Sequence, residues 1–464
     1  MTPMLGEVST TYQANSATNK VPTGYKITEV GVIPEEWNCV VIGELITDLR
    51  GGAPFKPTDF TKDGVKVLPK GGVIRGGLLR ILEKDQQFCS PSFASKYAKN
   101  RVNENYTIVV LRDLVPSGPS IGLMVKITNA ENFILAQGVY GFLAKNESIS
   151  AFLIQYSNTN KYRRAANEIM VGSTQVHITN GAFKEIKIAI PSDEKEQTAI
   201  ANALSDVDAL ISELEKLIAK KQAIKTATMQ QLLTGRTRLP QFALREDGTP
   251  KGTKPSELGE IPEDWEVHSL SSICDVRDGT HDSPKYKDNG IPLVTSKNIV
   301  DDILDLSNVS LISPEDAFEI DKRSKVDKGD IIMSMIGTVG SAVLLLEEPK
   351  FCIKNVALFK PKKVSGEFLV QLIRSKIFQD YLEDSMDGGI QKFVSLGTLR
   401  NMEISLPSEQ EQTAIASILS DMDNEIQALE QRLGKTRQIK QGMMQELLTG
   451  KTRLIKPSKE VIHE

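Results

Sequence analysis

The sequence is poor in cysteine and in long apolar runs. Only four cysteines occur in 464 residues, and neither a Cys-x-x-Cys pair nor a histidine cluster accompanies them. Scattered thiols of this kind argue against both a disulfide framework and a zinc site, and they fit a reducing, cytoplasmic compartment. The longest apolar stretch, residues 331–346, is too short and too rich in glycine and serine to span a bilayer. The polar N-terminus also lacks a signal-peptide core, so we expect a cytoplasmic protein that does not bind membranes.

Several motifs of catalysis are missing as well. The chain has no G-x-x-x-x-G-K-[ST] phosphate loop, no G-x-G-x-x-G loop, and no Asn-Pro-Pro-aromatic tetrapeptide of the kind that amino-methyltransferases use. No nucleophile and base, and no set of metal ligands, stand out. We therefore predict a non-catalytic chain with no catalytic residues, no metal site and no bound cofactor.

An internal repeat is the strongest feature of what the sequence does contain. Residues 196–239 recur as residues 411–454 without a gap, and 25 of these 44 positions are identical. Weaker matches extend the repeat, including Trp37 with Trp265 and Gln175 with Gln391. Such a repeat indicates a duplicated structural unit. We expect two half-molecules related by a pseudo-two-fold axis.

Each repeated segment has the pattern of a long helix. Apolar residues alternate at spacings of four and three, which is the period of a coiled-coil seam. The first seam is Ile200, Leu204, Val207, Ile211, Leu214 and Ile218; the second is Ile415, Leu419, Met422, Ile426, Leu429 and Leu433. Asp193 with Glu196, and Ser408 with Glu411, predict capping boxes at the helix starts, and Gly235 and Gly450 predict the ends. Because no other segment offers so long an apolar partner, we expect the two helices to pack on each other, antiparallel.

The regions that precede the helices show little identity with each other. Both have the pattern of mixed α/β domains. Strands are predicted at residues 107–111, 122–127, 292–295, 330–335 and 342–346, and terminal helical patterns at residues 150–167 and 367–382. Two unlike domains on matched helices predict a molecule with a recognition domain at each end.

The fold class is therefore α/β (mixed α+β) recognition domains in two copies, separated by two long antiparallel coiled-coil helices. The predicted segments are a polar tail (1–23), recognition domain 1 (24–190), the central helix (191–237), a linker (238–253), recognition domain 2 (254–406), the distal helix (407–452) and a C-terminal tail (453–464).

The net charge is −4, but the first half has a basic stretch that fits either nucleic-acid binding or an ordinary solvated face; the corresponding stretch of the second half is net acidic. Residues 50–101 contain eleven Lys or Arg against four Asp or Glu. Lysine and arginine neutralise phosphates, and asparagine and glutamine can pair with adenine. The candidate DNA-binding residues are Lys56, Lys70, Arg75, Arg101, Gln175, Thr280, His281, Ser296, Lys297, Asn298, Gln391 and Lys392. Among these, Gln175, Asn298 and Gln391 are the candidates for base readout.

The sequence resembles the specificity subunits of type I restriction-modification enzymes. The resemblance covers about residues 24–454. It rests on the two Ile-Pro-Glu-Glu/Asp-Trp segments ending at Trp37 and Trp265, the turn from Gly279 to Pro284, the strand from Ile291 to Asn298, the Glu-Gln helix starts after a proline and the Leu-Leu-Thr-Gly helix ends.

The resemblance implies a definite set of partners. In this family, two target-recognition domains each read half of a split double-stranded DNA sequence, and the helices separate them and bind two modification subunits. Those subunits carry S-adenosylmethionine and methyltransferase activity. Restriction subunits, which carry ATPase and endonuclease activity with ATP and Mg²⁺, join that core.

Two other functions fit parts of the sequence. A self-contained DNA methyltransferase is disfavoured because the donor-binding and Asn-Pro-Pro motifs are missing. A coiled-coil adaptor for protein partners is disfavoured because two unlike globular domains stand on matched helices.

Overall fold

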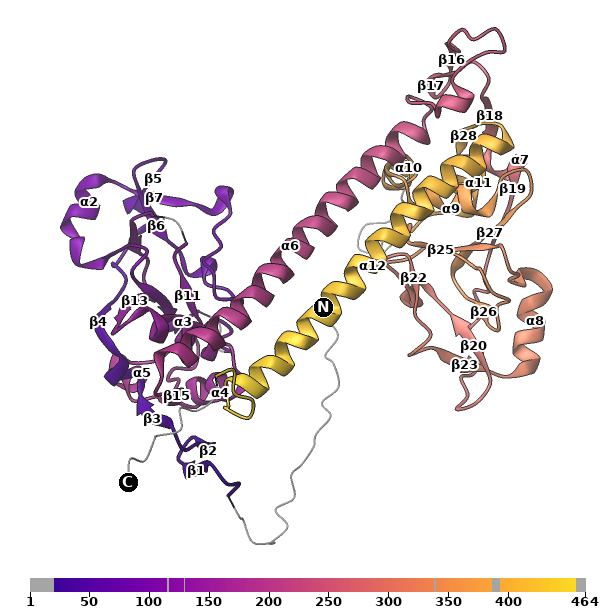
Figure 1. Cartoon of the computed structure of the whole chain (residues 1–464). Helices are drawn as coiled ribbons and strands as arrows, with labels where there is room; N and C mark the ends of the chain where they lie inside the picture. Colours follow the sequence, from indigo (N-terminus) through magenta and orange to yellow (C-terminus); the bar gives the residue numbers. More distant parts are fainter. Residues whose placement is uncertain (1–20, 115–116, 129, 338, 386–392, 456–464) are drawn as a thin grey trace. The chain divides into compact units, whose positions relative to one another are not determined.

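Two long helices are the largest elements of the computed structural model (Figure 1). α6 spans Glu194–Leu232 and α12 spans Glu409–Leu447, each with 39 residues. The structure describes residues 21–114, 117–128, 130–337, 339–385 and 393–455. Within these residues, no helix is both long enough and apolar enough to cross a membrane.

Each long helix is shared between two compact units. Unit 1 comprises residues 1–213 and 433–464, and unit 2 comprises residues 214–432. Unit 1 therefore contains the first part of α6 and the last part of α12, and unit 2 contains the remainder of both. This division differs from the predicted one, in which each helix was a separate segment.

Within each unit the two helical parts run antiparallel, as predicted. In unit 2, Lys221 pairs with Glu425 at 2.7 Å and Lys225 pairs with Asp423 at 2.5 Å, so rising numbers on α6 meet falling numbers on α12. In unit 1, Lys440 pairs with Asp208 at 2.5 Å. The predicted seam is also confirmed, since all twelve of its residues are buried or half-buried.

The ends of the seam pack on the domain cores as well as on the opposite helix. In unit 1, Ile200 and Leu204 share a core with Trp37 and Phe152, and Leu447 of α12 closes it. Unit 2 repeats this with Ile415, Leu419, Trp265, Phe368 and Leu232. Each core is therefore built from segments of both sequence repeats.

Unit 1 contains two main sheets. One is antiparallel and has the order β11 (Met124–Lys126), β9 (Thr107–Val110), β13 (Val139–Ala144), β4 (Ile46–Arg50). The other has the order β5 (Phe60–Thr61), β7 (Gln87–Cys89), β6 (Val65–Leu68), β12 (Phe133–Leu135), β8 (Arg101–Val102), with β12 and β6 parallel. Unit 1 also has three separate two-stranded sheets. They are β1 (Tyr25–Thr28) with β2 (Gly31–Pro34), β3 (Trp37–Val41) with β15 (Lys187–Pro191), and β10 (Arg112–Asp113) with β14 (Val176–His177). The helices are α1 (Ile42–Leu45), α2 (Pro91–Lys96), α3 (Glu147–Tyr156), α4 (Asn160–Glu168) and α5 (Asn180–Lys184).

Unit 2 has the same arrangement of sheets, but its second sheet has fewer strands than that of unit 1. Its antiparallel sheet has the order β19 (Cys274–Asp278), β27 (Val356–Pro361), β24 (Ile331–Ser334), β25 (Ala342–Leu344). The second sheet has the order β23 (Ser310–Ile312), β20 (Ile291–Val294), β26 (Cys352–Ile353), with β20 and β26 parallel. The strand pairs are β16 (Thr253–Ser256) with β17 (Gly259–Pro262), β18 (Glu266–Ser269) with β28 (Glu403–Leu406), and β21 (Ile299–Val300) with β22 (Ile303–Leu304). The helices are α7 (Leu270–Ile273), α8 (Pro314–Ser324), α9 (Gly366–Arg374), α10 (Lys376–Ser385) and α11 (Leu396–Asn401).

The five predicted strands form at the predicted places, but two helical predictions need correction. Each terminal helical pattern, predicted as one stretch, is divided into two helices: α3 and α4 in unit 1, and α9 and α10 in unit 2. Thr159 caps α4 by accepting a hydrogen bond from Tyr162, and Ser375 accepts one from Phe378 at 3.4 Å. These side chains satisfy free amides, so a new helix begins where the periodicity alone predicts continuation.

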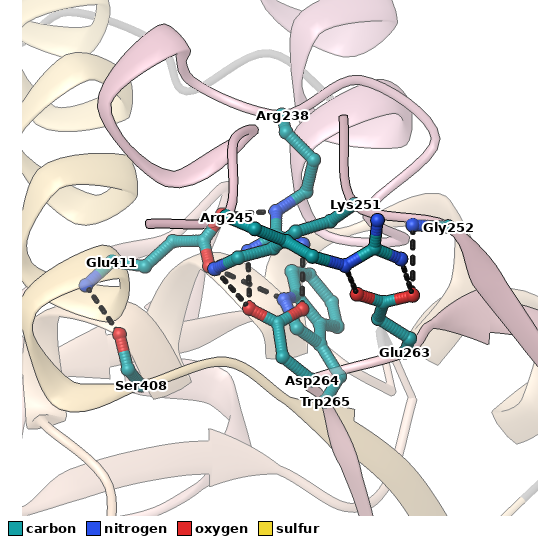
Figure 2. Close-up of polar contacts among 9 residues, drawn as sticks. All are labelled: Arg238, Arg245, Lys251, Gly252, Glu263, Asp264, Trp265, Ser408 and Glu411. Carbon is teal, nitrogen blue, oxygen red and sulfur yellow. Dashed lines mark hydrogen bonds and ion pairs between the residues drawn. The ribbon is translucent and has the colours of Figure 1, made fainter. Parts of the chain in front are cut away.

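The predicted capping box of the second long helix is half formed, because the Glu411 amide donates to the Ser408 hydroxyl at 3.4 Å. The glutamate carboxylates have a different role. Arg238, beyond the end of α6, donates to both carboxylate oxygens of Glu411, at 2.6 and 2.7 Å (Figure 2). The same guanidinium pairs with Asp264 at 2.7 Å, and the Trp265 indole donates to Glu411 at 3.2 Å. Glu411 is 2% exposed and Arg238 is 10% exposed, so this is a buried ion pair. It fastens the residues after one long helix to the start of the other.

Unit 1 contains the same anchor. Arg453, beyond the end of α12, donates to Glu196 at 2.7 Å and to Glu36 at 3.0 Å. Gly450 makes the turn between helix and anchor at a positive φ of 72°, and a Cβ there would lie 2.4 Å from Pro34. The predicted glycine helix ends are thus confirmed, and close packing on the proline adds a second reason for glycine.

The anchor of unit 2 makes its stability sensitive to acid. Burial opposes ionisation of Asp264, but hydrogen bonds from Arg238 and Lys251 outweigh it and lower the pKa of Asp264 to about 2. Because the folded pKa lies below the ordinary value of 3.8, the stabilisation is complete above about pH 4 and is lost as the pH falls toward 2. After allowance for solvent screening, we expect Asp264→Asn to lower the free energy of unfolding by about 1 kcal/mol at pH 7. Urea unfolding at pH 7 and pH 3 measures this; an equal difference between wild type and variant at both pH values would contradict it.

Candidate nucleic-acid interface

Three loops meet at equivalent places in the two units. They are the loop after β4 or β19, the loop after β6 or β20, and the residues before β13 or β27. In unit 1, Ala53 donates to Leu135 at 2.8 Å and Ala136 donates to Leu68 at 3.1 Å. In unit 2, Thr280 donates to Ile353 at 3.0 Å and Lys354 donates to Val294 at 2.9 Å. Backbone hydrogen bonds therefore hold the three loops in one cluster, which we call the loop cluster of each unit.

A glycine allows the closest approach inside each cluster. A Cβ on Gly52 would lie 1.8 Å from the carbonyl oxygen of Ala136, and one on Gly279 would lie 2.4 Å from that of Ile353. No side chain fits at such distances. The two glycines occupy equivalent positions, so this backbone contact belongs to the shared scaffold.

Asn355 is the centre of the loop cluster of unit 2. It has a positive φ of 52°, and its side-chain oxygen lies 2.8 Å from Nδ1 of His281. Its carbonyl accepts a hydrogen bond from Ser296 at 3.1 Å, and its amide donates to Thr280 at 3.2 Å. The structure thus brings together three predicted residues, Thr280, His281 and Ser296.

A buried carboxylate fixes the histidine from its other side. Asp278 is 7% exposed, and its Oδ2 lies 2.7 Å from Nε2 of His281, which is itself 63% exposed. Arg323 of α8 pairs with the other oxygen of Asp278. Lys354 donates to Ser283 at 2.6 Å across the same loops. The cluster therefore presents an oriented imidazole and the Arg323 guanidinium to solvent, whereas Lys354 is buried.

The loop cluster of unit 1 is built around a different carboxylate. Asp113 is 2% exposed, pairs with Lys70 at 2.6 Å and accepts a hydrogen bond from Ser120 at 2.6 Å. The neighbouring Arg112 donates to the side-chain oxygen of Gln175 at 2.9 Å. The predicted residues Lys70 and Gln175 therefore contact two neighbouring residues of β10, Asp113 and Arg112 respectively. Within the described part of the chain, only the side-chain oxygen of Gln175 is used, by Arg112.

The remaining predicted residues divide into exposed and buried groups. Lys56, Arg75, Arg101 and Lys297 are exposed, as a phosphate contact requires. Gln391 and Lys392 lie outside the described residues.

Asn298 does not have the geometry of a base-reading side chain. It is 7% exposed, its oxygen accepts a hydrogen bond from the Thr295 amide at 3.0 Å, and its nitrogen donates to the Asp305 carbonyl at 3.1 Å. Both polar atoms are used to hold the turn. Ser296 is also buried and bonds the chain internally, so the exposed Lys297 between them is the residue of this loop best placed for a ligand.

Sequence reasoning missed five residues of the clusters: Arg112, Asp113, Asp278, Lys354 and Asn355. Asp278 directly precedes the turn from Gly279 to Pro284, and Asp113 follows a predicted strand. Nothing near Asn355 in the sequence marks it as a site residue, because only the fold brings it beside Thr280.

The accessible groups of both clusters suit binding rather than covalent chemistry. They are cations, amides, hydroxyls and one imidazole. Burial raises the pKa of the Cys274 and Cys352 thiols to about 12, so neither is a thiolate nucleophile. Two α/β domains with equivalent loop clusters of unlike composition define a class: a protein that recognises a polyanionic, hydrogen-bonding ligand at two sites.

Comparison with known proteins places the chain within that class. Residues 34–226 and 262–441 match the family described as the type I restriction modification DNA specificity domain. The two matches cover most of the chain, one in each half. The chain belongs to this family of DNA specificity subunits, as the sequence resemblance implied.

Individual relatives agree with this assignment. The chain is 28% identical over 436 residues to the specificity subunit of the type I restriction enzyme MjaVIII from Methanocaldococcus jannaschii, covering 91% of this chain and 94% of that one. It is 25% identical to the EcoBI specificity subunit of Escherichia coli, over 80% of this chain and 76% of that one. The S subunit structure from M. genitalium superposes with a TM-score of 0.56 at 16% identity, covering 89% and 96% of the two chains, which supports the shared fold.

The glycine contact generates a test of the loop cluster. We expect Gly52→Ala to lower the free energy of unfolding by about 1–3 kcal/mol, because the new methyl group would overlap the Ala136 carbonyl. Gly71→Ala, in the adjacent loop, is the matched control, since nothing lies within 4 Å of its Cβ position. Thermal unfolding of both variants measures the difference. Equal melting temperatures for the two variants would contradict the close approach.

Proposed function

We propose that this chain reads a split, asymmetric double-stranded DNA target, with one half of the target read by each unit. The observation that carries the proposal is that equivalent loop positions on equal scaffolds bear different side chains. Ala53 corresponds to Thr280, and Gly138 to Asn355. Protein symmetry normally sets target symmetry, so unlike clusters on matched scaffolds require unlike half-sites.

The groups in each cluster divide by the contacts they suit. Exposed cations such as Lys56, Arg75 and Lys297 suit phosphates, which position the protein on the duplex. Gln175, held by Arg112, suits a base edge. The exposed His281 ring suits stacking or packing against the ligand, because Asn355 and Asp278 occupy both of its nitrogens. Orientation by a second residue reduces the entropy lost on binding.

We further propose that the chemistry is supplied by partner subunits. Two modification subunits, which carry S-adenosylmethionine, would bind the long helices, and restriction subunits with ATP and Mg²⁺ would join them. The purified chain alone would neither methylate nor cut DNA. Its four cysteines are free thiols, which fits the cytoplasm, where the DNA lies.

The test is to express the chain with a modification subunit and to sequence the methylated sites of the host genome. We expect one bipartite motif whose two halves differ and whose spacer has a constant length. A single contiguous motif, or a perfect palindrome, would contradict the proposal. Methylation by the chain without a modification subunit would contradict the non-catalytic role.

Removal of the Lys70 ammonium tests the phosphate assignment. We expect Lys70→Met to weaken binding to all sequences and to reduce the slope of log K against log salt by about 0.9, the value for one phosphate contact. Lys26→Met is the control, because Lys26 lies in the β1–β2 hairpin and donates to Glu35. The double variant K70M/D113N avoids leaving the Asp113 carboxylate buried without its cation. Titrations at several salt concentrations decide the point, and an unchanged slope in both Lys70 variants means that Lys70 does not contact phosphate.

Lengthening both helices tests whether they set the spacer. Insertion of four residues into the middle of α6 and of α12 adds about 6 Å, on the order of one to two base pairs. We expect the same half-sites with a longer spacer, since the loop clusters are unchanged. Insertion into α6 alone is the control, and it should abolish methylation by breaking the antiparallel seam. An unchanged spacer in the double insertion would show that the helices hold the subunit together without determining the distance.

A further inference from the structure

One partly buried polar contact, made by a buried glutamine, occurs at equivalent positions in both units. In unit 1, the side-chain nitrogen of Gln155 on α3 lies 3.3 Å from Asp208 on α6, and Asp208 pairs with Lys440 on α12 at 2.5 Å. In unit 2, Gln371 on α9 donates to Asp423 on α12 at 2.9 Å, and Asp423 pairs with Lys225 on α6 at 2.5 Å. We call each Gln–Asp–Lys set a junction. Each junction joins a recognition domain to both long helices at one point.

The junctions are poor candidates for devices that only add stability. Gln155 and Gln371 are each 2% exposed, and the side-chain oxygen of each has no hydrogen-bond partner among the residues that the structure describes. A buried acceptor without a partner costs free energy. The same cost appears at both equivalent positions. An arrangement that is repeated despite its cost points to a role in selecting one packing register of the helices rather than in adding stability.

The apolar seam by itself does not define one register. A heptad seam shifted by seven residues still places apolar residues against apolar residues. The junctions distinguish the observed register from a register shifted by seven residues. After such a shift, Asp208 would face residue 433 or 447 instead of Lys440, and both of these are leucines. Asp423 would face Ile218 or Leu232 instead of Lys225. A seven-residue slip therefore leaves the Asp208 carboxylate, whose side chain is 12% exposed, against leucine and without its cation, which is unfavourable. Asp423, 35% exposed, also loses its cation but keeps more solvent.

The two junctions agree with each other along the helices. Asp208 and Lys225 are 17 residues apart on α6, and Asp423 and Lys440 are 17 residues apart on α12. Both ion pairs therefore specify the same antiparallel register. The glutamine adds a third element, because it links this register to the helix of the recognition domain that packs beside it.

We infer that Gln155, Asp208 and Lys440, with Gln371, Asp423 and Lys225, are positioning residues that lock the register of α6 against α12 and thereby restrict the DNA target to one spacer length. The inference rests on the proposed function, because it assigns the device that makes the spacer constant. The arginine anchors hold the helix ends, and each junction holds the register at an interior point. Loss of one junction therefore loosens the register at that point, and targets with altered spacers become substrates.

The experiment compares three forms of the chain, each expressed with a modification subunit. Asp208→Asn breaks the ion pair with little change in shape. The double variant D208K/K440D reverses the pair, and rotation of the Gln155 amide would then offer its unpaired oxygen to the new lysine. The charge reversal K221E/E425K is the matched control, because this pair also joins α6 to α12 but is 33% and 50% exposed.

The first readout is the spacer length of the methylated sites. We expect wild type to prefer one spacer over a neighbouring length by about tenfold or more, since DNA twist must absorb any mismatch. Asp208→Asn should reduce this preference to about threefold or less with the half-sites unchanged, because only the helix register is altered. D208K/K440D should restore it, and K221E/E425K should retain it. Constant spacers in Asp208→Asn, or relaxed spacers in a folded D208K/K440D, would overturn the inference.

The second readout needs no DNA and separates this inference from the proposed function. Spin labels on Asp206→Cys and Gly442→Cys, both exposed positions of unit 1, report the register of the helices in a Cys39→Ser background. We expect a single narrow distance distribution in wild type and D208K/K440D, and a broadened or shifted one in Asp208→Asn. A narrow, unchanged distribution in Asp208→Asn would overturn the register lock even if the chain reads a split target. A broadened distribution in Asp208→Asn, without any methylated split target in wild type, would overturn the proposed function and the spacer role but retain the lock.

Discussion

The buried arginine–glutamate ion pair is the interaction on which each unit depends. Arg238 and Arg453 follow the ends of the two long helices, and each closes on a glutamate at the start of the other helix. Breaking a buried pair of this kind leaves an uncompensated charge, which is strongly destabilising. The anchors therefore force each core to be completed by the other repeat. This explains why the compact units divide both helices.

Because each core is completed by the other repeat, the shared scaffold meets one of two conflicting requirements of a DNA-reading protein, and the loops meet the other. The scaffold must stay constant so that its helices pack, and the reading surface must vary with the target. Here the constant part comprises the seam, the anchors, the Gln–Asp–Lys junctions and the close-approach glycines. The three loops held by backbone hydrogen bonds carry different side chains in the two units. Because those bonds involve no side chain, residues such as Asn355 and its counterpart Gly138 differ while the loops keep their places.

Much of the architecture was predictable because it depends on periodicity. The seam residues, the antiparallel direction, the five strands and the glycine helix ends all follow from local patterns or from the repeat. Errors arose where a local pattern had a competing tertiary partner. Glu411 has the spacing of a capping-box residue, yet an arginine 173 residues away binds its carboxylate. Asn298 has the chemistry of a base reader, yet its own turn uses both of its polar atoms.

The sequence by itself determined the duplication, the class of each element and the family, because these depend on residue order and spacing. Only the tertiary structure decided which polar side chains face solvent and which hold loops together. Asp113 and Lys70, 43 residues apart, form one ion pair, and His281 and Asn355, 74 residues apart, form one contact. Such pairs leave no periodic trace in the chain. They arise when parallel strands such as β20 and β26 bring distant loops to the same edge of a sheet.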